Sequence, residues 1–236
     1  MNEQFQRQVM LTGKNALDQL HHSHVAVFGV GGVGSFCAEA LARAGIGSIT
    51  LVDDDVVSKS NINRQLIALH STIGKAKTEI MAARIADINP DCKVTGITAR
   101  YEPSVRDSFF GPKYDFIADA IDSVACKIDL IETSIHKNIP IISAMGTGNK
   151  LDPTKFEITD ISKTSGCPLA RVVRKELRDR GILHHTVLYS TELPIKPITE
   201  YQQPGERPVP GSVSWVPSSA GLLIAGYIIQ SLINRE

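Results

Sequence analysis

The sequence predicts an α/β fold: a doubly wound, Rossmann-like and mostly parallel sheet with helices on both faces. Three observations lead to this prediction. Short apolar segments without polar alternation recur between segments of helical spacing, as expected for strands buried on both faces. A glycine-rich turn directly follows the first of these strands. The chain of 236 residues, 42% of them hydrophobic, is long enough to bury a substantial core.

Most of the predicted elements lie in residues 1–150, which we interpret as a nucleotide-binding core. The predicted strands are short apolar runs bounded by turn residues, at residues 24–30, 48–52, 92–97, 114–118 and 139–143. The predicted helices have apolar residues at helical spacing, at residues 33–44, 73–88 and 124–137. Strands and helices that alternate in this way build a doubly wound sheet.

Residues 151–236 form an extension that we place on the substrate side of the same continuous domain. Residues 156–161 have the pattern of another strand, and residues 168–180 that of a basic helix. Residues 182–216 are rich in proline, threonine and serine, which predicts a long irregular loop. Residues 217–233 are expected to form a final helix that packs on the core.

Composition limits the classes of protein to be considered. The 25 basic and 25 acidic residues give zero net charge, which argues against a chain coated with basic side chains. The first ten residues lack the apolar core of a signal peptide. The apolar run at residues 220–229 is about half the length that spans a bilayer. We therefore expect a cytoplasmic protein with no membrane partner.

The cysteines argue against a metal or disulfide scaffold. Cys37, Cys92, Cys126 and Cys167 are widely separated, and no two of them form a C-x-x-C pair. Zinc ribbons and disulfide frameworks need closely spaced cysteines, so we expect no zinc and four reduced thiols.

A glycine-rich segment, GVGGVG at residues 29–34, has the pattern of a nucleotide-binding loop. Such a loop turns tightly and directs the following helix N-terminus at phosphate. Asp53 ends the next strand, where a carboxylate can bind ribose hydroxyls. On these two features alone, an NAD-type dehydrogenase is the default interpretation. A catalytically silent NAD-binding or regulatory module is an alternative of a different class. The glycines assigned to the nucleotide are Gly29, Gly31, Gly32 and Gly34.

The residues that follow favour ATP. Arg64 and Lys77 are expected at the same crevice, where their positive charges would neutralise the charge that develops when the α-phosphate of a triphosphate is attacked. Asp122 follows the strand at residues 114–118, at a position suited to holding Mg²⁺ against phosphates. Each residue alone also fits a surface or capping role, but together they predict a site for ATP and Mg²⁺.

Six motifs in this order resemble the ATP-dependent adenylyltransferases related to ubiquitin-activating enzymes. They are FQRQ (5–8), GVGGVG (29–34), LVDDD (51–55), SNINRQ (60–65), GKAK (74–77) and DAIDS (119–123). This resemblance implies ATP contacts at Asp53, Asp55, Asn61, Arg64, Gln65, Lys77, Asp122 and Ser123, with Asp122 holding Mg²⁺. It leaves a monovalent cation open as a further cofactor.

Arg7 belongs to the first of these motifs. By the resemblance it would reach the ATP of the partner subunit in a homodimer, so that the catalytic residues are Arg7, Arg64, Lys77 and Asp122. From the residues alone, Arg7 is a charge on a flexible N-terminal tail.

The rest of the chain favours one branch of that family. The segments at residues 158–181, 190–192 and 210–232 resemble the tRNA threonylcarbamoyladenosine dehydratases. The resemblance implies that ATP activates the threonylcarbamoyl carboxylate on a tRNA adenosine beside the anticodon, that the nucleoside cyclises, and that AMP leaves. Cys167-Pro168 stands where a relative carries an acidic residue before proline, and we assign no catalytic role to Cys167.

A local basic segment fits a tRNA substrate despite the zero net charge. Residues 163–180 carry six positive and two negative side chains. Helical spacing puts several of the positive ones on one face, which would contact phosphates without reading sequence. A solvated amphipathic helix has the same pattern. The tRNA contacts predicted here are Lys163, Arg171, Arg174, Lys175 and Arg178.

The main alternative is an adenylyltransferase that activates the C-terminal glycine of a ubiquitin-like or sulfur-carrier protein. Members with that role usually carry two C-x-x-C zinc pairs or a catalytic-cysteine domain, and this sequence has neither pattern. A nucleophile within the substrate needs no enzyme thiol, which agrees with the scattered cysteines. A cysteine desulfurase with a sulfur acceptor stays open as a partner system.

Overall fold

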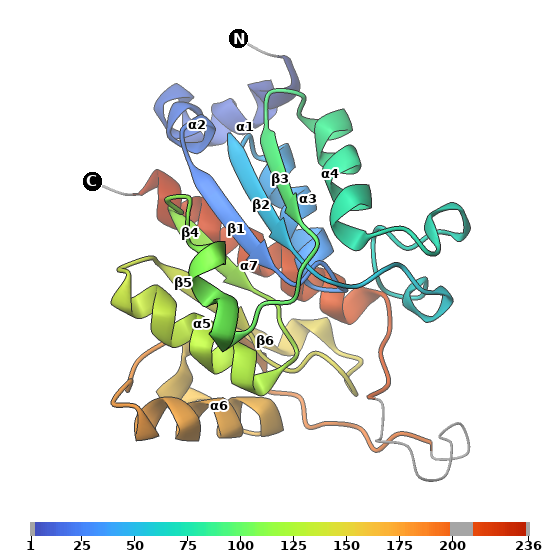
Figure 1. The fold of residues 1–236 in the computed structure, drawn as a ribbon, viewed down its shortest axis with the longest axis vertical. Coiled ribbons are helices and arrows are strands. Elements are labelled where there is room, and N and C mark those ends of the chain that lie inside the picture. Colours follow the sequence, from blue (N-terminus) through green and yellow to red (C-terminus); the bar gives the residue numbers. More distant parts are fainter. Residues whose placement is uncertain (1–2, 199–209, 235–236) are drawn as a thin grey trace.

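The computed structural model describes residues 3–198 and 210–234 and contains one central sheet (Figure 1). The strands lie in the order β3-β2-β1-β4-β5-β7-β6. Their bounds are β1 (His24–Phe28), β2 (Ser48–Val52), β3 (Lys93–Ile97), β4 (Phe116–Asp119), β5 (Ile141–Ala144), β6 (Phe156–Asp160) and β7 (Thr186–Ser190). All pairings between these strands are parallel except that of β6 with β7. The predicted doubly wound α/β fold is therefore confirmed.

Helices cover both faces of the sheet. Their bounds are α1 (Gln6–Thr12), α2 (Lys14–His21), α3 (Gly34–Arg43), α4 (Lys77–Ile88), α5 (Val124–His136), α6 (Pro168–Asp179) and α7 (Trp215–Ile233). Helices α3, α4 and α7 pack on one face, and α5 and α6 on the other. Short 3₁₀ helices occur at Glu3–Phe5, Lys59–Asn61, His70–Thr72, Pro103–Phe109, Pro153–Lys155 and Ile161–Lys163.

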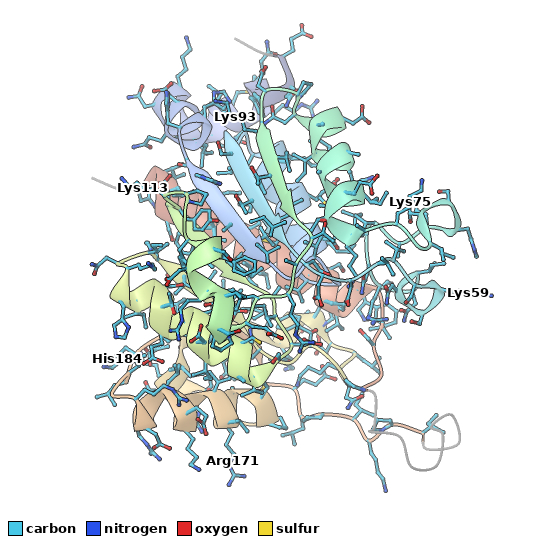
Figure 2. All side chains as sticks on the ribbon, viewed as in Figure 1. Lys59, Lys75, Lys93, Lys113, Arg171 and His184 are labelled. Atoms are coloured by element: carbon cyan, nitrogen blue, oxygen red, sulfur yellow. The ribbon has the colours of Figure 1, made fainter. Side chains whose placement is uncertain are left out.

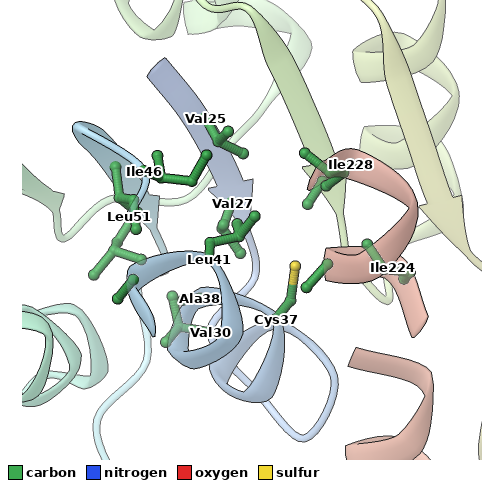
Figure 3. Close-up of a cluster of buried hydrophobic side chains, with 14 of the residues drawn as sticks. Val25, Val27, Val30, Cys37, Ala38, Leu41, Ile46, Leu51, Ile224 and Ile228 are labelled. Atoms are coloured by element: carbon green, nitrogen blue, oxygen red, sulfur yellow. The ribbon is translucent and has the colours of Figure 1, made fainter. Parts of the chain in front are cut away.

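Strand β1 shows why the strand sequences are uniformly apolar. Successive side chains point to opposite faces of the sheet. Val25 and Val27 therefore join the core formed with α3 and α7, shown in Figure 3, whereas Ala26 and Phe28 join the core on the α5 side. All four are fully buried, so neither face of the strand tolerates a polar residue.

The extension departs from the sequence prediction. Residues 182–216 were expected to form one irregular loop, but β7 lies within this range and is inserted between β5 and β6. Val187, Leu188 and Tyr189 are buried there. The five residues of β7 therefore form a strand because they pair with β5 and β6. The prediction of a single loop was wrong for this part, and residues 199–209 lie outside the described residues.

The N-terminal segment is also more ordered than a flexible tail. Helices α1 and α2 precede the sheet, and Phe5 and Leu20 are anchored in the protein at 1% and 0% exposure. Arg7 is therefore carried on a defined helix.

The final helix is long and apolar enough to cross a membrane by length and composition. In this structure, however, Val216, Ala220, Ile224 and Ile228 are buried in the protein. Helix α7 thus serves as a core helix that packs on α3 and the sheet.

Gly221 permits the close contact between α7 and the start of α3. A Cβ atom at this position would lie 2.3 Å from the Val33 carbonyl oxygen and 3.0 Å from the Cys37 backbone nitrogen. Neither backbone atom can move without displacing α3.

We expect Gly221→Ala to lower the free energy of unfolding by about 1–3 kcal/mol through overpacking. Gly226→Ala is the matched control, because a Cβ there meets no heavy atom within 4 Å. Alanine in this helix interior should instead stabilise by roughly 0.5–1 kcal/mol. Urea unfolding measures both changes, and equal stability of the two variants would contradict the packing described.

Candidate functional site

A cavity of about 480 Å³ lies at the carboxyl ends of β1, β2 and β4. The strand order reverses between β1 and β4, and ligands of doubly wound sheets bind at such a position. Eleven of the twelve residues predicted to bind ATP line it: Gly29, Gly31, Gly32, Asp53, Asp55, Asn61, Arg64, Gln65, Lys77, Asp122 and Ser123.

The glycine loop separates residues that face the cavity from one that shapes the turn. Gly31 and Gly32 line the cavity. The twelfth predicted residue, Gly34, is not among the lining residues, and a Cβ atom on it would lie 1.8 Å from the Gly29 carbonyl oxygen. Gly34 therefore acts by letting the loop fold back on itself, and α3 then begins with its backbone N–H groups near the cavity.

Asp53 connects the glycine loop to the segment after β2. Its carboxylate accepts hydrogen bonds from the Val30 backbone N–H at 2.6 Å and the Asp55 backbone N–H at 2.9 Å. Burial raises the pKa of Asp53, and the positive charge of Lys77, 3.7 Å away, opposes that rise. The side chain is 8% exposed and sits at the predicted ribose position.

Lys77 reaches the cavity because α4 begins later than expected. Gly74 has a φ of +84°, and Ala76 bridges to Val56, so the helix starts at Lys77 instead of residue 73. The Lys77 ammonium lies 2.6 Å from the Asp55 carboxylate, whose side chain is 66% exposed. Phosphate oxygens entering the cavity can compete for this ammonium, because its present partner is largely solvated.

Arg64 is oriented by its own segment. Its Nη1 donates to the Ser60 carbonyl oxygen and to Asn63 Oδ1, both at 2.9 Å. The Asn63 amide in turn donates to the Ser212 carbonyl oxygen at 2.9 Å. The guanidinium is therefore connected to the segment that returns to α7, and Ser212 itself lines the cavity.

Gln65 carries an unsatisfied polar atom at the cavity. The residue is 8% exposed, and its Oε1 has no hydrogen-bond partner within the described parts of the chain. An unsatisfied buried acceptor costs about 1–3 kcal/mol. This atom therefore indicates that a polar ligand or water completes the site.

Asp122 has the chemistry of a Mg²⁺ ligand. It is exposed, lines the cavity and offers hard carboxylate oxygens. Among residues 3–198 and 210–234, no ion pair or hydrogen bond engages its carboxylate. In the other acidic group, Asp53 to Asp55, Lys77 pairs with Asp53 and Asp55. Asp122 thus fits the predicted metal role.

No zinc site is evident in the described structure. The four cysteines are free and buried, and the single candidate cluster of metal-ligating side chains within the described ranges contains none of them.

Other lining residues were not predicted. Arg100 and Tyr101 follow β3, and Thr147 follows β5, so their positions after strand ends were the available signal. Ser212 and Pro217 arrive from the far end of the chain through tertiary folding. No pattern within their own segment indicates that they meet the glycine loop.

Arg7 does not join the cavity of its own chain. It is exposed on α1, at the end of the sheet where β1 and β2 begin, whereas the cavity lies where they end (Figure 1).

The basic helix α6 borders a groove of about 860 Å³. Arg171, Lys175 and Arg178 are exposed along it, and Arg171 points away from the sheet in Figure 2. Arg174 also lines the groove, but its Nη1 donates to the Thr164 carbonyl and hydroxyl oxygens, both at 2.7 Å. Lys163 is exposed and is not a lining residue.

The groove adjoins the cavity through the loop after β5. A Cβ on Gly146 would lie 3.8 Å from Leu169 Cβ and 4.0 Å from Cys167 Sγ at the start of α6. The next residue, Thr147, lines the cavity.

Comparison with known proteins agrees with this geometry. The sequence profile of the ThiF family matches residues 5–236. The tRNA threonylcarbamoyladenosine dehydratase of Bacillus subtilis is 45% identical, over 99% of this chain and 96% of that protein. Crystal structures of the Escherichia coli tRNA N6-threonylcarbamoyladenosine dehydratase, in complex with AMP and with ATP, have TM-scores of 0.90 and 0.88 at 36% identity. They cover 98% of this chain and 94% and 93% of theirs. The chain therefore belongs to the ThiF family and, within it, groups with the tRNA threonylcarbamoyladenosine dehydratases.

Proposed function

We propose that this protein is an ATP-dependent tRNA threonylcarbamoyladenosine dehydratase. The observation that carries the proposal is one cavity in which a glycine loop, a buried carboxylate, two cations and a carboxylate unpaired within the described residues converge. The full-length relatives bear the name of this activity, and one was solved with ATP.

The geometry suits adenylation of a carboxylate. A carboxylate is a poor acyl donor because its oxygen leaves poorly, whereas AMP is a good leaving group. The substrate carboxylate attacks the α-phosphate, and pyrophosphate leaves. Arg64 and Lys77 would stabilise the charge that shifts onto pyrophosphate. Magnesium held by Asp122 would supply further neutralisation of phosphate charge.

The second half of the reaction needs no enzyme nucleophile. A nucleophilic group of the threonylcarbamoyl substituent attacks the activated carbonyl carbon, the bond from that carbon to the AMP oxygen breaks, and the ring closes. Cys126 lines the cavity but is only 6% exposed. Cys167 is 4% exposed and lies at the start of α6. Its burial agrees with a packing role.

The α6 groove is the surface that we assign to the tRNA backbone. Its free cations, Arg171, Lys175 and Arg178, lie along one exposed helix face next to the cavity. Arg174 contributes charge but is held by Thr164, so its main role is to fix the preceding turn. A tRNA substrate and four buried, reduced thiols are typical of a cytoplasmic protein.

A homodimer would give Arg7 a role. Arg7, Met10 and Leu11 share the exposed face of α1, and the two apolar side chains are 80% and 90% exposed. Exposed apolar residues of this size favour burial against a partner. Because Arg7 is far from the cavity of its own chain, we place it at the cavity of the second subunit.

The proposed reaction is tested by nucleoside analysis of threonylcarbamoyladenosine-containing tRNA after incubation with enzyme, ATP and Mg²⁺. We expect conversion to the cyclic nucleoside with release of AMP, and a loss of about 100-fold or more in Asp122→Ala and Arg64→Ala. Asp91→Ala, an exposed carboxylate before β3, should react like wild type.

The same assay separates the alternatives. Parallel reactions contain a sulfur-carrier protein, or a cysteine desulfurase with its sulfur acceptor. Adenylation that requires the carrier and ignores tRNA would overturn the tRNA assignment.

The tRNA surface is tested by Arg171→Glu combined with Arg178→Glu. Losing two phosphate contacts should weaken tRNA binding and reduce the slope of log K against log salt by roughly 1–2. Lys14→Glu with Lys93→Glu changes the net charge equally at exposed positions away from α6 (Lys93 in Figure 2). If both pairs change the slope alike, the groove has no special role.

The role of Arg7 in the partner site is tested by mixing two inactive variants, Arg7→Ala and Arg64→Ala. A mixed dimer would hold one intact site, because Arg7 and Arg64 of that site come from different chains. Random mixing should restore about a quarter of wild-type activity, since half the dimers are mixed and each has one of two sites. Sedimentation measures whether dimers form. If mixed dimers recover no activity, Arg7 does not act in the partner's site.

A further inference from the structure

A fully buried ion pair lies directly behind the segment that carries Asp122. Lys127 Nζ is 2.6 Å from Asp119 Oδ2, and both side chains are 0% exposed. Neither residue is among those that line the cavity. Asp119 ends β4, Lys127 lies in the first turns of α5, and the cavity-lining residues 120–123 run between them.

The pair fixes both ends of this segment. The second carboxylate oxygen of Asp119 accepts the Ile121 backbone N–H at 3.0 Å, which sets the turn that leads into Asp122. The Lys127 backbone N–H donates to the Ser123 carbonyl oxygen at 2.9 Å. Lys127 therefore holds the end of the segment with its backbone and the start with its ammonium, through Asp119.

Stability alone does not explain an ionic pair here. Removing two charges from water costs several kcal/mol per ion, and apolar residues of similar size are often as stable. A leucine in place of Asp119, however, could not accept the Ile121 N–H. The carboxylate supplies that acceptor, and the ammonium neutralises the carboxylate.

The surroundings of Lys127 leave Asp119 as its counter-charge. His185, the residue before β7, is a second titratable group close to Lys127. Its Nε2 forms a hydrogen bond with Ser143 Oγ at 2.8 Å. Burial, and then the charge of Lys127, lower the pKa of His185 to about 3, so this ring is neutral at physiological pH.

We propose that Lys127, acting through Asp119, is a positioning residue that holds the Asp122 carboxylate where it meets the Mg²⁺ of bound ATP. The proposal rests on the role assigned to Asp122 above. It explains why the buried end of β4 contains an ion pair, with 2.6 Å between Asp119 and Lys127, where apolar side chains could pack instead.

The test compares two double variants, Asp119→Asn with Lys127→Met and Asp119→Leu with Lys127→Met. Both remove both charges, but only asparagine can accept the Ile121 N–H. The readout is the Kd of ATP with and without Mg²⁺, which needs no turnover. We expect the Mg²⁺-dependent gain in affinity to be about 10-fold or more larger in the asparagine variant than in the leucine variant. The Kd without Mg²⁺ should be similar in both.

The single variant Lys127→Met should lose about as much of the Mg²⁺-dependent gain in ATP affinity as the leucine double variant does. Its kcat should fall as well. Arg84→Met is its control, because it removes an ion pair with Glu39 on the opposite face of the sheet, at 2.6 Å. The control should keep the wild-type response to Mg²⁺. If Lys127→Met fails to fold, the two charge-free variants still decide whether the acceptor at position 119, through which Lys127 is proposed to act, controls the Mg²⁺ response.

Equal Mg²⁺ responses in the two double variants would overturn the proposal. A wild type whose Kd for ATP is the same with and without Mg²⁺ would also overturn it. The tRNA reaction fails separately: a normal Mg²⁺ response in a wild type that leaves tRNA unmodified would refute the proposed substrate and leave the role of Lys127 intact.

Discussion

The carboxylate of Asp53 is the contact on which the cavity depends. It binds the backbone of the glycine loop after β1 and the backbone of the segment after β2, and it lies within 3.7 Å of the ammonium at the start of α4. Three elements that are separate in sequence thereby share one anchor. Its burial is tolerable because two N–H donors and a cation face it. The same oxygens lie at the sheet edge where a ribose is expected.

The sequence predicted the parts of this arrangement that depend on local physics. Strand β2 occurs at the expected residues 48–52. A short apolar run that ends at an acidic cluster favours a buried strand over a helix. The motif residues Asp53, Arg64 and Lys77 follow β2 and meet the glycine loop, which follows β1, because these parallel strands end at one edge of the sheet. Residues that depend on tertiary contacts escaped prediction. Strand β7 needs β5 and β6 beside it, and Ser212 reaches the cavity through Asn63.

Helical spacing also predicted that the basic residues of α6 are equally available to a ligand, and the structure shows that they are not. Arg171 and Arg174 are alike in sequence, but the first is exposed and the second is bound to the Thr164 turn. Helical spacing assigns a face, whereas only the neighbouring turn decides which cation remains free. A neutral chain can in this way present a small cationic groove beside an anionic-ligand cavity.

The position of α7 has a consequence for how the chain acquires its structure. One face of β1 is covered by α3, close to it in sequence, and by α7, nearly two hundred residues later. During synthesis, Val27 and its neighbours stay uncovered until residues 216–232 have left the ribosome. Such long-range closure slows folding and exposes apolar surface to aggregation. The nascent chain is therefore expected to depend on chaperone protection until its last helix arrives.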